Sequence, residues 1–469
     1  MKETKSEIFK EFGTLKEKSS EEKIIFLESL YDSKLSQDEL NSIYDLITDN
    51  DKGVRNSVAY LLIKNANENI ARKIVPYTFS HDTSTINFVG EILIKIGSEA
   101  VNAILDYIDT DNDDNKKFLV DILGLLGDNR ASAKITKILN SSESENVILA
   151  CIEALGNLKS EKSLYHLMAF YGLNDLYKPT VVESLGKIGS PAALGFIVSK
   201  YEEESDDLIK FSIIESLGLI GDEETFFFLL AELNEVKGPL VWPIIKSIYS
   251  LKERFGFDIP FDERMKKIIL LTIVEANTEY KKIAANLLSV FNDKEIISAY
   301  LKILGEDIEI DEIITPKFWE NPQIVFEIIS ELLNQNPQNI KALLTLLMDT
   351  IQLDGEEKYN IIPPVQLRSL IDSLSHYLSD YDEEIRMLAL ELLFIIDKNA
   401  AVLFVDDFSE DNNLWNRLKL VDLLHEVFHP KANEALIKLS NDTEEMIRER
   451  AISSLSKRNL LTGRQDIHI

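Results

Sequence analysis

The sequence predicts an all-α protein: a right-handed α-solenoid of about a dozen helix-pair repeats. The first observation is a phrase that recurs five times between residues 90 and 222, at steps of 30 to 32 residues. The second is a different phrase near both ends of the chain, in which acidic residues precede a basic one. A fixed period in this range indicates stacked units that bury their apolar faces only against their neighbours. The five copies are EILIKIG (91–97), DILGLLG (121–127), EALGNLK (153–159), ESLGKIG (183–189) and ESLGLIG (215–221).

Each copy is expected to form two short helices, as residues 177–207 illustrate. Val181, Leu185 and Ile188 have the three-and-four spacing of one face of a first helix. The Gly-Ser-Pro run at 189–191 ends that helix and caps the next, because glycine tolerates the left-handed conformation and serine offers an N-cap. A second helix with the same spacing follows, and an acidic turn closes the unit.

Four glycines lie inside the predicted first helices, where each costs about 1 kcal/mol relative to alanine. Because this cost is repeated in consecutive units, we expect the backbones of neighbouring first helices to approach each other closely at these positions. The residues are Gly124, Gly156, Gly186 and Gly218.

The second phrase combines acidic residues, a basic residue, a small residue and a leucine in a constant frame. An aspartate just before a helix caps its free N–H groups. An arginine one turn into the helix can reach the aspartate of the neighbouring repeat, which would build a ladder of charge-assisted hydrogen bonds. We therefore interpret the arginines of this phrase as structural, namely Arg55, Arg386, Arg417 and Arg448. The same basic position is held by Lys281 and, in the middle copies, by Lys116, Lys178 and Lys210.

These recurring features together resemble the HEAT repeat, in the short bacterial form that is also found in phycobilisome-lyase-like proteins. The resemblance is clear over residues 47–235 and 376–469 and weaker between them. It implies an armadillo-like superhelix that presents a long surface to partners. The same solenoid serves scaffolds, adaptors, inhibitors and a few enzymes, so the resemblance is specific for fold and nearly silent on function.

The spacing of the phrases divides the chain into four segments. Residues 1–46 are expected to form an N-terminal helical cap, and residues 47–235 the regular repeat array. Residues 236–375 are expected to be irregular helical repeats with loops, among them 353–364, because the period slips there and Gly and Pro interrupt the helices. Residues 376–469 resume the regular step and end in a short tail.

The net charge of −30 constrains the partners of the chain. It opposes binding to the nucleic acid backbone, for which a basic stripe would be expected. It favours another protein with a basic surface, although the same acidity would also simply keep an extended apolar stack soluble. We expect a protein partner and no nucleic acid.

The hydropathy of the sequence predicts a cytoplasmic protein that does not enter a membrane. No apolar run approaches the ~18 residues of a membrane helix, and the N-terminus has no apolar signal region. The single cysteine, Cys151, excludes an internal disulfide. It holds the small-residue position of its repeat, so we expect a buried packing thiol.

One short motif suggests a metal site. His425, Glu426 and His429 have the H-E-x-x-H spacing of zinc proteases, in which two imidazoles share a helix face and the glutamate is the general base. In the repeat frame, however, His429 coincides with Ser190 and lies in a turn directly before Pro430, which disfavours a helical conformation. We expect no metal and no catalytic residues, and a zinc-dependent hydrolase remains a remote alternative.

A second enzymatic alternative follows from the resemblance alone. Bilin lyases of the phycobilisome type share the repeat, so a HEAT-like lyase or enzyme of the bilin-attachment type stays open. HEAT-like di-iron hydroxylases carry several His-Glu pairs on separate repeats, whereas this chain has only His425-Glu426. No residue pattern marks a chromophore site, and we expect no cofactor.

A row of aromatic residues on three adjacent second helices is the candidate partner-binding surface. The row lies beside positions already assigned to the core, and we expect it on the concave face, since aromatic residues dominate interface hot spots. The alternative is that some of the rings pack between neighbouring second helices. Our leading hypothesis is a non-enzymatic protein-interaction scaffold or adaptor, in bacterial signalling or complex assembly. The residues are Tyr165, His166, Phe196, Phe227 and Phe228.

Overall fold

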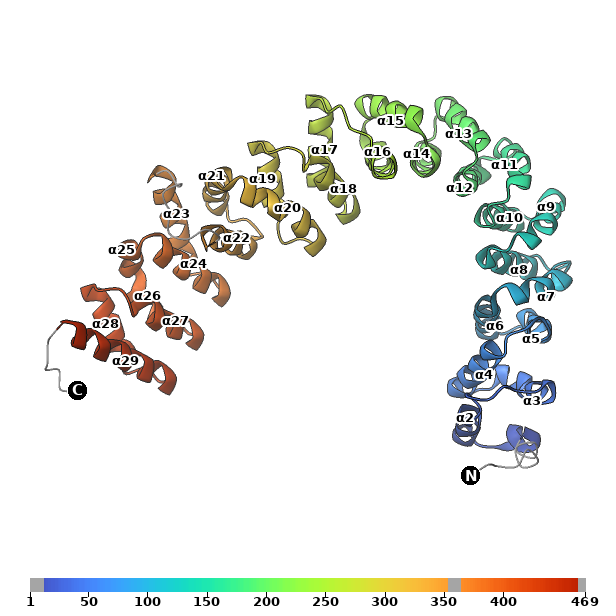
Figure 1. Ribbon diagram of the computed structural model, residues 1–469, viewed down its shortest axis with the longest axis horizontal. Helices are drawn as coiled ribbons and strands as arrows, with labels where there is room; N and C mark the ends of the chain where they lie inside the picture. The colour runs from blue at the N-terminus through green and yellow to red at the C-terminus, as the bar shows by residue number, and fades with distance from the viewer. Residues whose placement is uncertain (1–11, 353–363, 463–469) are drawn as a thin grey trace. The chain divides into compact units, whose positions relative to one another are not determined.

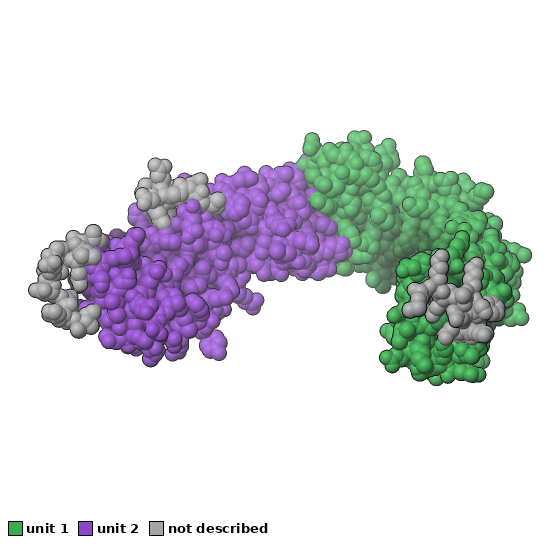
Figure 2. All heavy atoms as spheres, turned by 60° about the horizontal axis from the view of Figure 1, so that its bottom comes forward, with its two compact units in different colours: residues 1–259 green, residues 260–469 purple. Residues whose placement is uncertain are grey.

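The computed structural model describes residues 12–352 and 364–462, and every regular element within these ranges is a helix. This confirms the all-α fold. The chain forms two compact units, residues 1–259 and 260–469 (Figure 2). The four-segment division and the hand of the superhelix stay predictions. The predicted loop at 353–364 lies, except for its last residue, outside the described residues.

Unit 1 contains seven helix pairs followed by α16 (Val241–Phe255). The first helices are α2 (Ser20–Ser29), α4 (Lys52–Lys64), α6 (Thr83–Ile96), α8 (Asp113–Leu126), α10 (Glu145–Asn157), α12 (Lys178–Ile188) and α14 (Asp207–Ile220). The second helices are α3 (Gln37–Ile43), α5 (Glu68–Ile74), α7 (Val101–Tyr107), α9 (Ser132–Ser141), α11 (Leu164–Tyr171), α13 (Pro191–Glu203) and α15 (Glu223–Glu235). Each first helix packs on the next first helix, and the second helices form a separate layer (Figure 1).

The turn between α12 and α13 has the capping geometry that its sequence predicts. Gly189 follows α12 in the left-handed conformation, with φ 71° and ψ 22°. Ser190 is the N-cap of α13, and its hydroxyl accepts a hydrogen bond from the backbone N–H of Ala193 at 3.1 Å. Local residue types therefore determine where one helix ends and the next begins.

The glycines inside the first helices of unit 1 mark close helix contacts, as predicted. A Cβ added to Gly156 would lie 2.6 Å from Ser184 Cβ and 2.7 Å from Ser184 Cα. The Ser184 hydroxyl donates a hydrogen bond back to the carbonyl of Ile152 at 2.9 Å. The same arrangement pairs Gly186 with Ser216 and Gly218 with Ser247. Each of these glycines thus contacts a serine of the next repeat. That serine lies two residues before the position that corresponds to the glycine in the repeat frame.

This close approach makes the first-helix layer the inner layer of unit 1. Small residues let successive first helices pack tightly, whereas the bulkier second helices are spread farther apart, so the unit curves toward its first helices. Figure 1 shows α8, α10, α12 and α14 on the inner side and α9, α11, α13 and α15 on the outer side.

Unit 2 begins with α17 (Glu263–Glu275) and contains five further helix groups before α29 (Glu445–Thr462). Its first helices are α18 (Thr278–Leu288), α20 (Ile308–Glu320), α22 (Ile340–Gln352), α24 (Glu383–Ile396) and α27 (Leu414–Leu424). Its second helices are α19 (Lys294–Ile303), α21 (Pro322–Leu333), α23 (Pro364–Tyr377), the short α25 (Lys398–Ala401) and α26 (Val405–Phe408), and α28 (Pro430–Leu439). Within residues 12–352 and 364–462, the seven pairs of unit 1 and these five groups, with α16, α17 and α29 besides, agree with the prediction of about a dozen repeats. α18 packs on α20 and α22 packs on α24, but α20 and α22 are not closely packed.

Candidate protein-binding surfaces

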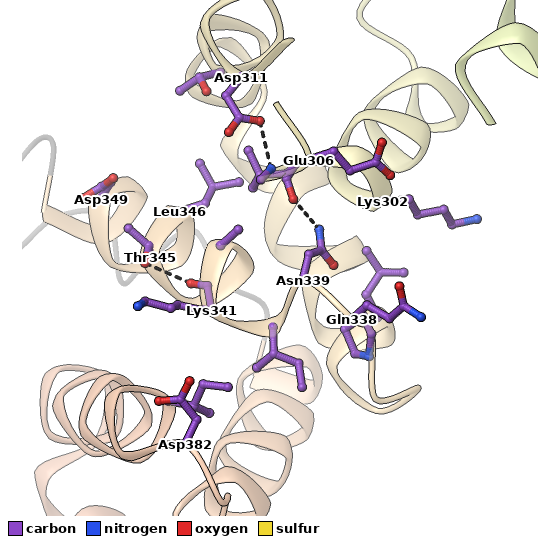
Figure 3. Close-up of a pocket in the computed structure, with 18 residues that line it drawn as sticks. Lys302, Glu306, Asp311, Gln338, Asn339, Lys341, Thr345, Leu346, Asp349 and Asp382 are labelled. Carbon is purple, nitrogen blue, oxygen red and sulfur yellow. Dashed lines mark hydrogen bonds between the residues drawn. The ribbon is translucent and has the colours of Figure 1, made fainter. Parts of the chain in front are cut away.

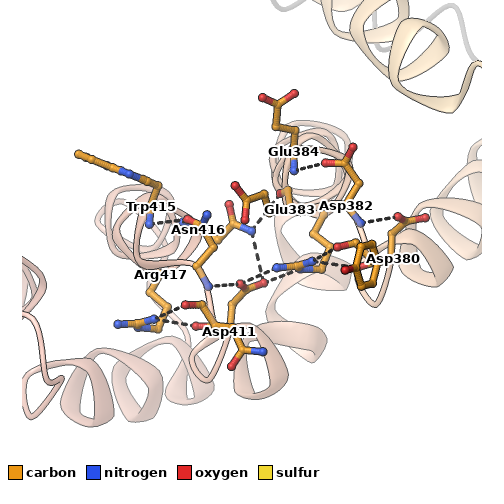
Figure 4. Close-up of polar contacts among 12 residues, drawn as sticks. Asp380, Asp382, Glu383, Glu384, Asp411, Trp415, Asn416 and Arg417 are labelled. Atoms are coloured by element: carbon orange, nitrogen blue, oxygen red, sulfur yellow. Dashed lines mark hydrogen bonds and ion pairs between the residues drawn. The ribbon is translucent and has the colours of Figure 1, made fainter.

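The recurring arginines of unit 2 form the ladder that the sequence predicts (Figure 4). The Arg386 guanidinium binds both carboxylate oxygens of Asp411 in the next repeat, at 2.7 and 2.9 Å. Arg417 binds Asp442 in the same way, at 2.7 and 3.0 Å. The remaining nitrogen of Arg386 donates to the backbone carbonyl of Asp380 in its own turn. These arginines therefore tie consecutive repeats together.

The aspartates of this ladder are held in their charged form. Burial acts to raise the pKa of Asp411, but hydrogen bonds from Arg386 and from the backbone N–H of Asn413 outweigh it and lower the pKa. The pKa of Asp442 is lowered chiefly by the hydrogen bonds from Arg417. Because their charges are engaged within the fold, these aspartates are structural, like the arginines that bind them.

The ladder does not extend along the whole chain, which corrects part of the prediction. Arg55 and Arg448 donate to backbone carbonyls of their own turns, and neither binds a carboxylate of a neighbouring repeat among the described residues. In unit 1, Lys178 reaches Glu204, in the turn that leads to the next first helix, at 3.0 Å. Lys116 instead lies 3.7 Å from Asp113 in its own repeat. A lysine lacks the two-pronged geometry of arginine, so these contacts are less uniform.

The residues of the predicted aromatic row differ in their exposure to solvent. Tyr165 is 74% exposed and Phe227 is 51% exposed, and His166 is exposed as well. Phe196 and Phe228 are half-buried. The first group is available to a partner, whereas the second belongs in part to the packing between repeats.

The two half-buried rings pack edge-to-face on tyrosines of the preceding repeat. Phe196 lies 5.6 Å from Tyr171 between ring centroids, and Phe228 lies 5.3 Å from Tyr201. The Tyr201 hydroxyl donates to Glu232 at 2.8 Å, which anchors the same tyrosine to the next second helix. The 30-residue spacing of the two tyrosines, which matches the repeat period, is a sequence signal from which this packing could have been predicted.

The row also lies on the outer layer of unit 1, so the expected concave placement is wrong. All of its residues belong to α11, α13 and α15, the second helices (Figure 1). The physical reason is the glycine and serine contacts described above, which draw the first helices to the inner side of the curve.

The H-E-x-x-H motif does not form on one helix. α27 ends at Leu424, and His425 is its C-cap, with Nδ1 3.0 Å from the hydroxyl of Ser454. His429 has an extended backbone and is the N-cap of α28, where its Nδ1 accepts from the N–H of Lys431 at 3.2 Å. His429 therefore lies in the turn, as its repeat frame predicted. Within the described residues, no group of three or more potential ligands could hold a metal ion.

A cleft of about 890 Å³ opens in unit 2, where α20 and α22 are not closely packed (Figure 3). The loop at its edge is held by Asn339, whose side-chain amide donates to the carbonyls of Leu301 and Leu304, both at 2.9 Å. Asp311 accepts from the N–H of Gly305 at 2.9 Å. The cleft is therefore bordered by fixed backbone. Its only sequence signal was the slip of the repeat period over 236–375.

The lining of this cleft combines a buried apolar floor with an acidic rim. Leu304 and Leu346 are buried beneath it, while Asp349 and Asp382 carry exposed carboxylates at its edge. The Lys341 ammonium is paired with Glu384. Such a site can accept an apolar side chain flanked by positive charge.

No family model matches this chain, and no curated protein matches it. Among solved structures, a Kap121p triple mutant shares 12% identity and a TM-score of 0.38 over 98% of this chain, which spans 50% of the Kap121p chain. A structure from a study of the phosphorylation switch that controls the interaction between cadherin and beta-catenin shares 14% identity and a TM-score of 0.32, covering 92% of this chain and 100% of that one. An engineered protein shares 14% identity and a TM-score of 0.25, covering 89% of this chain and 98% of that one.

These TM-scores are all below 0.5, so the likenesses carry no argument about what the protein binds. The fold itself defines the class of this protein, an all-α helical-repeat solenoid. The described part of the chain has no helix with the length and hydropathy of a membrane span.

Proposed function

We propose that this protein is a non-enzymatic scaffold or adaptor of the HEAT type that binds another protein in the cytoplasm, in bacterial signalling or complex assembly. The observation that supports it most directly is the contrast between side chains that bind a neighbouring repeat and aromatic side chains that remain exposed. The ladder arginines and aspartates are consumed in contacts between repeats, whereas Tyr165 and Phe227 project from second helices without such a role. Large aromatic side chains left exposed on a rigid frame are typical of binding surfaces.

The arrangement around these two rings suits a docking surface. Gly195 holds the matching position on the intervening helix α13, and an added Cβ there would meet nothing within 4 Å. Tyr165 and Phe227 thus flank a position without a side chain. An apolar group of a partner can lie there between two aromatic neighbours.

The test is affinity capture of the tagged chain from its native cytoplasm, with mass spectrometry and metal analysis of the eluate. The wild type is compared with the double variant Tyr165→Ser, Phe227→Ser and with the control Leu173→Ser, whose leucine has an exposure between those of the two rings but lies outside the row. Phe196 and Phe228 are left intact because they contribute to packing.

We expect a stoichiometric protein that the wild type and the control retain and the double variant loses, with unchanged far-UV circular dichroism. Equal capture by all three forms would contradict the assignment of this surface. Stoichiometric zinc or iron without any protein would overturn the scaffold function itself.

A further inference from the structure

The turns that precede α24, α27 and α29 form a continuous edge of unit 2, which we call the ladder edge (residues 380–384, 411–415 and 442–446). Arg386 joins the first turn to the second through Asp411, and Arg417 joins the second to the third through Asp442. Both ion pairs have side chains that are at most 15% exposed. The edge is therefore a preorganised surface, which reduces the entropy lost when a partner binds.

Three large side chains project from the ladder edge into solvent. Tyr381 is fully exposed, Trp415 is 60% exposed and Met446 is 46% exposed. Trp415 and Met446 occupy the same position, two residues before the recurring arginines Arg417 and Arg448. Figure 4 shows the Trp415 ring turned away from the ladder. Isolated exposed apolar residues are ordinary, but their recurrence on consecutive turns of one edge indicates an interaction surface.

The same edge carries negative charge that the fold does not neutralise. Among its cations, Arg386 and Arg417 are paired with the ladder aspartates, whereas Arg448 donates to the backbone carbonyls of Asp442 and Thr443. Several further carboxylates have no ion pair within the described residues. These are Asp380, Asp382, Glu383, Glu444 and Glu445. Because these five carboxylates outnumber the single charge of Arg448, the edge favours an occupant that brings positive charge.

We infer that the ladder edge binds an extended, basic segment of a partner protein, with a lysine or arginine of that segment over the Trp415 ring. Tryptophan is the strongest aromatic partner for a cation, and a negative surround favours the contact further. Neighbouring repeats lie about 10 Å apart, which an extended chain spans in about three residues. The segment should therefore carry a basic residue at every third position.

The inference rests on the proposed function in one respect, that the protein binds another protein. The ladder edge itself lies in unit 2, whereas the surface around Tyr165 and Phe227 lies in unit 1. The ladder edge also adjoins the cleft, because Asp382 lines both. A segment that follows the edge toward α24 can thus place an apolar side chain on the floor of the cleft.

The test uses the full chain and a fluorescein-labelled peptide, (Arg-Gly-Ser)4, followed by fluorescence anisotropy at physiological salt, with (Glu-Gly-Ser)4 as the opposite-charge probe. Trp415→Ala should weaken binding of the arginine peptide about tenfold, the size expected for loss of a cation–π contact with partial desolvation. The matched control is Leu403→Ser, since Leu403 is also 60% exposed but lies in a short 3-10 helix, Val402–Phe404, away from the edge.

Binding that Leu403→Ser preserves and Trp415→Ala weakens would support the inference, provided that the glutamate peptide does not bind. Equal affinity of the wild type and Trp415→Ala would overturn it, because the peptide would then merely respond to the net charge. The double variant Tyr165→Ser, Phe227→Ser should bind the peptide normally. The capture experiment with this double variant tests the proposed function, and the peptide experiment with Trp415→Ala tests the inference. Either hypothesis can therefore be refuted without the other.

Discussion

Replacing Gly156 with alanine would test the close approach of the first helices in unit 1. The added Cβ would lie 2.6 Å from Ser184 Cβ and 2.7 Å from Ser184 Cα, closer than real Cβ atoms come to other atoms. Because Ser184 Cα belongs to the backbone, no side-chain rotation relieves the overlap. α10 and α12 must move apart.

The expected loss of stability follows from three contributions. Alanine gains about 1 kcal/mol over glycine in helix propensity. Overpacking of a tight contact costs roughly 1–3 kcal/mol. Separation of the helices also weakens the Ser184–Ile152 hydrogen bond, 2.9 Å long, which is worth about 1 kcal/mol. The net effect is a destabilisation of roughly 1–3 kcal/mol.

Native-state hydrogen exchange of the amides in α10 and α12 measures this change locally, which suits a repeat protein whose unfolding need not be two-state. The control is Gly195→Ala, because Gly195 is helical and its added Cβ meets nothing within 4 Å, so α13 should gain up to about 1 kcal/mol. Protection of α10 and α12 that is unchanged or increased in Gly156→Ala would refute the reasoning.

Three further predictions concern single side chains. Arg417→Lys removes the two-pronged bond to Asp442, and the exchange protection of α29 should fall by about 1–2 kcal/mol. The control Lys419→Arg, at a half-buried lysine that is paired with Glu391, keeps the charge and should leave the protection of α29 unchanged. The pKa of Glu204 is lowered from 4.5 to about 2, where the bonds from Lys178 and two backbone N–H groups outweigh burial. As the pH falls, the carboxylate of Glu204 takes up a proton at a higher pH in the unfolded chain than in the folded one. The ionised carboxylate therefore contributes roughly 3 kcal/mol of stability above pH 4.5, and this contribution is lost as the pH falls toward 2. A Glu204→Gln variant with the same acid sensitivity in a pH series of urea denaturations would contradict this. Burial raises the pKa of the Cys151 thiol to about 12, so a thiol reagent at pH 8 should label the native chain at least about a hundredfold more slowly than the chain in urea.

The parts of the fold that were predictable depend on contacts within one repeat or on a residue type that recurs in every repeat. Gly189 and Ser190 act on the backbone beside them, so their capping roles can be read from three consecutive residues. Gly156 was informative because glycine recurs at the equivalent positions 186 and 218, although it destabilises a helix at each of them. Such a recurring destabilisation indicates a recurring close contact between helices.

The binding surfaces were predictable only in part, because the exposure of a side chain depends on the neighbouring repeat. Phe196 and Phe227 are the same residue type at nearby positions of equivalent helices. Phe196 is covered because Tyr171 of the preceding repeat meets its ring, whereas Phe227 remains half exposed. The exposure of Trp415 was likewise hidden in the sequence, where it is one more apolar residue near a helix start.

By itself, the sequence determined the helical class, the repeat period, the caps and the identity of the residues that join one repeat to the next. These features follow from periodicity and local backbone preference, which act over a few residues. Only the tertiary structure decided which arginines find a carboxylate, which aromatic rings stay exposed, and that the cleft opens between α20 and α22. Those outcomes depend on the distance and angle between successive repeats, which are set by the summed packing of many side chains and which no single residue pattern encodes.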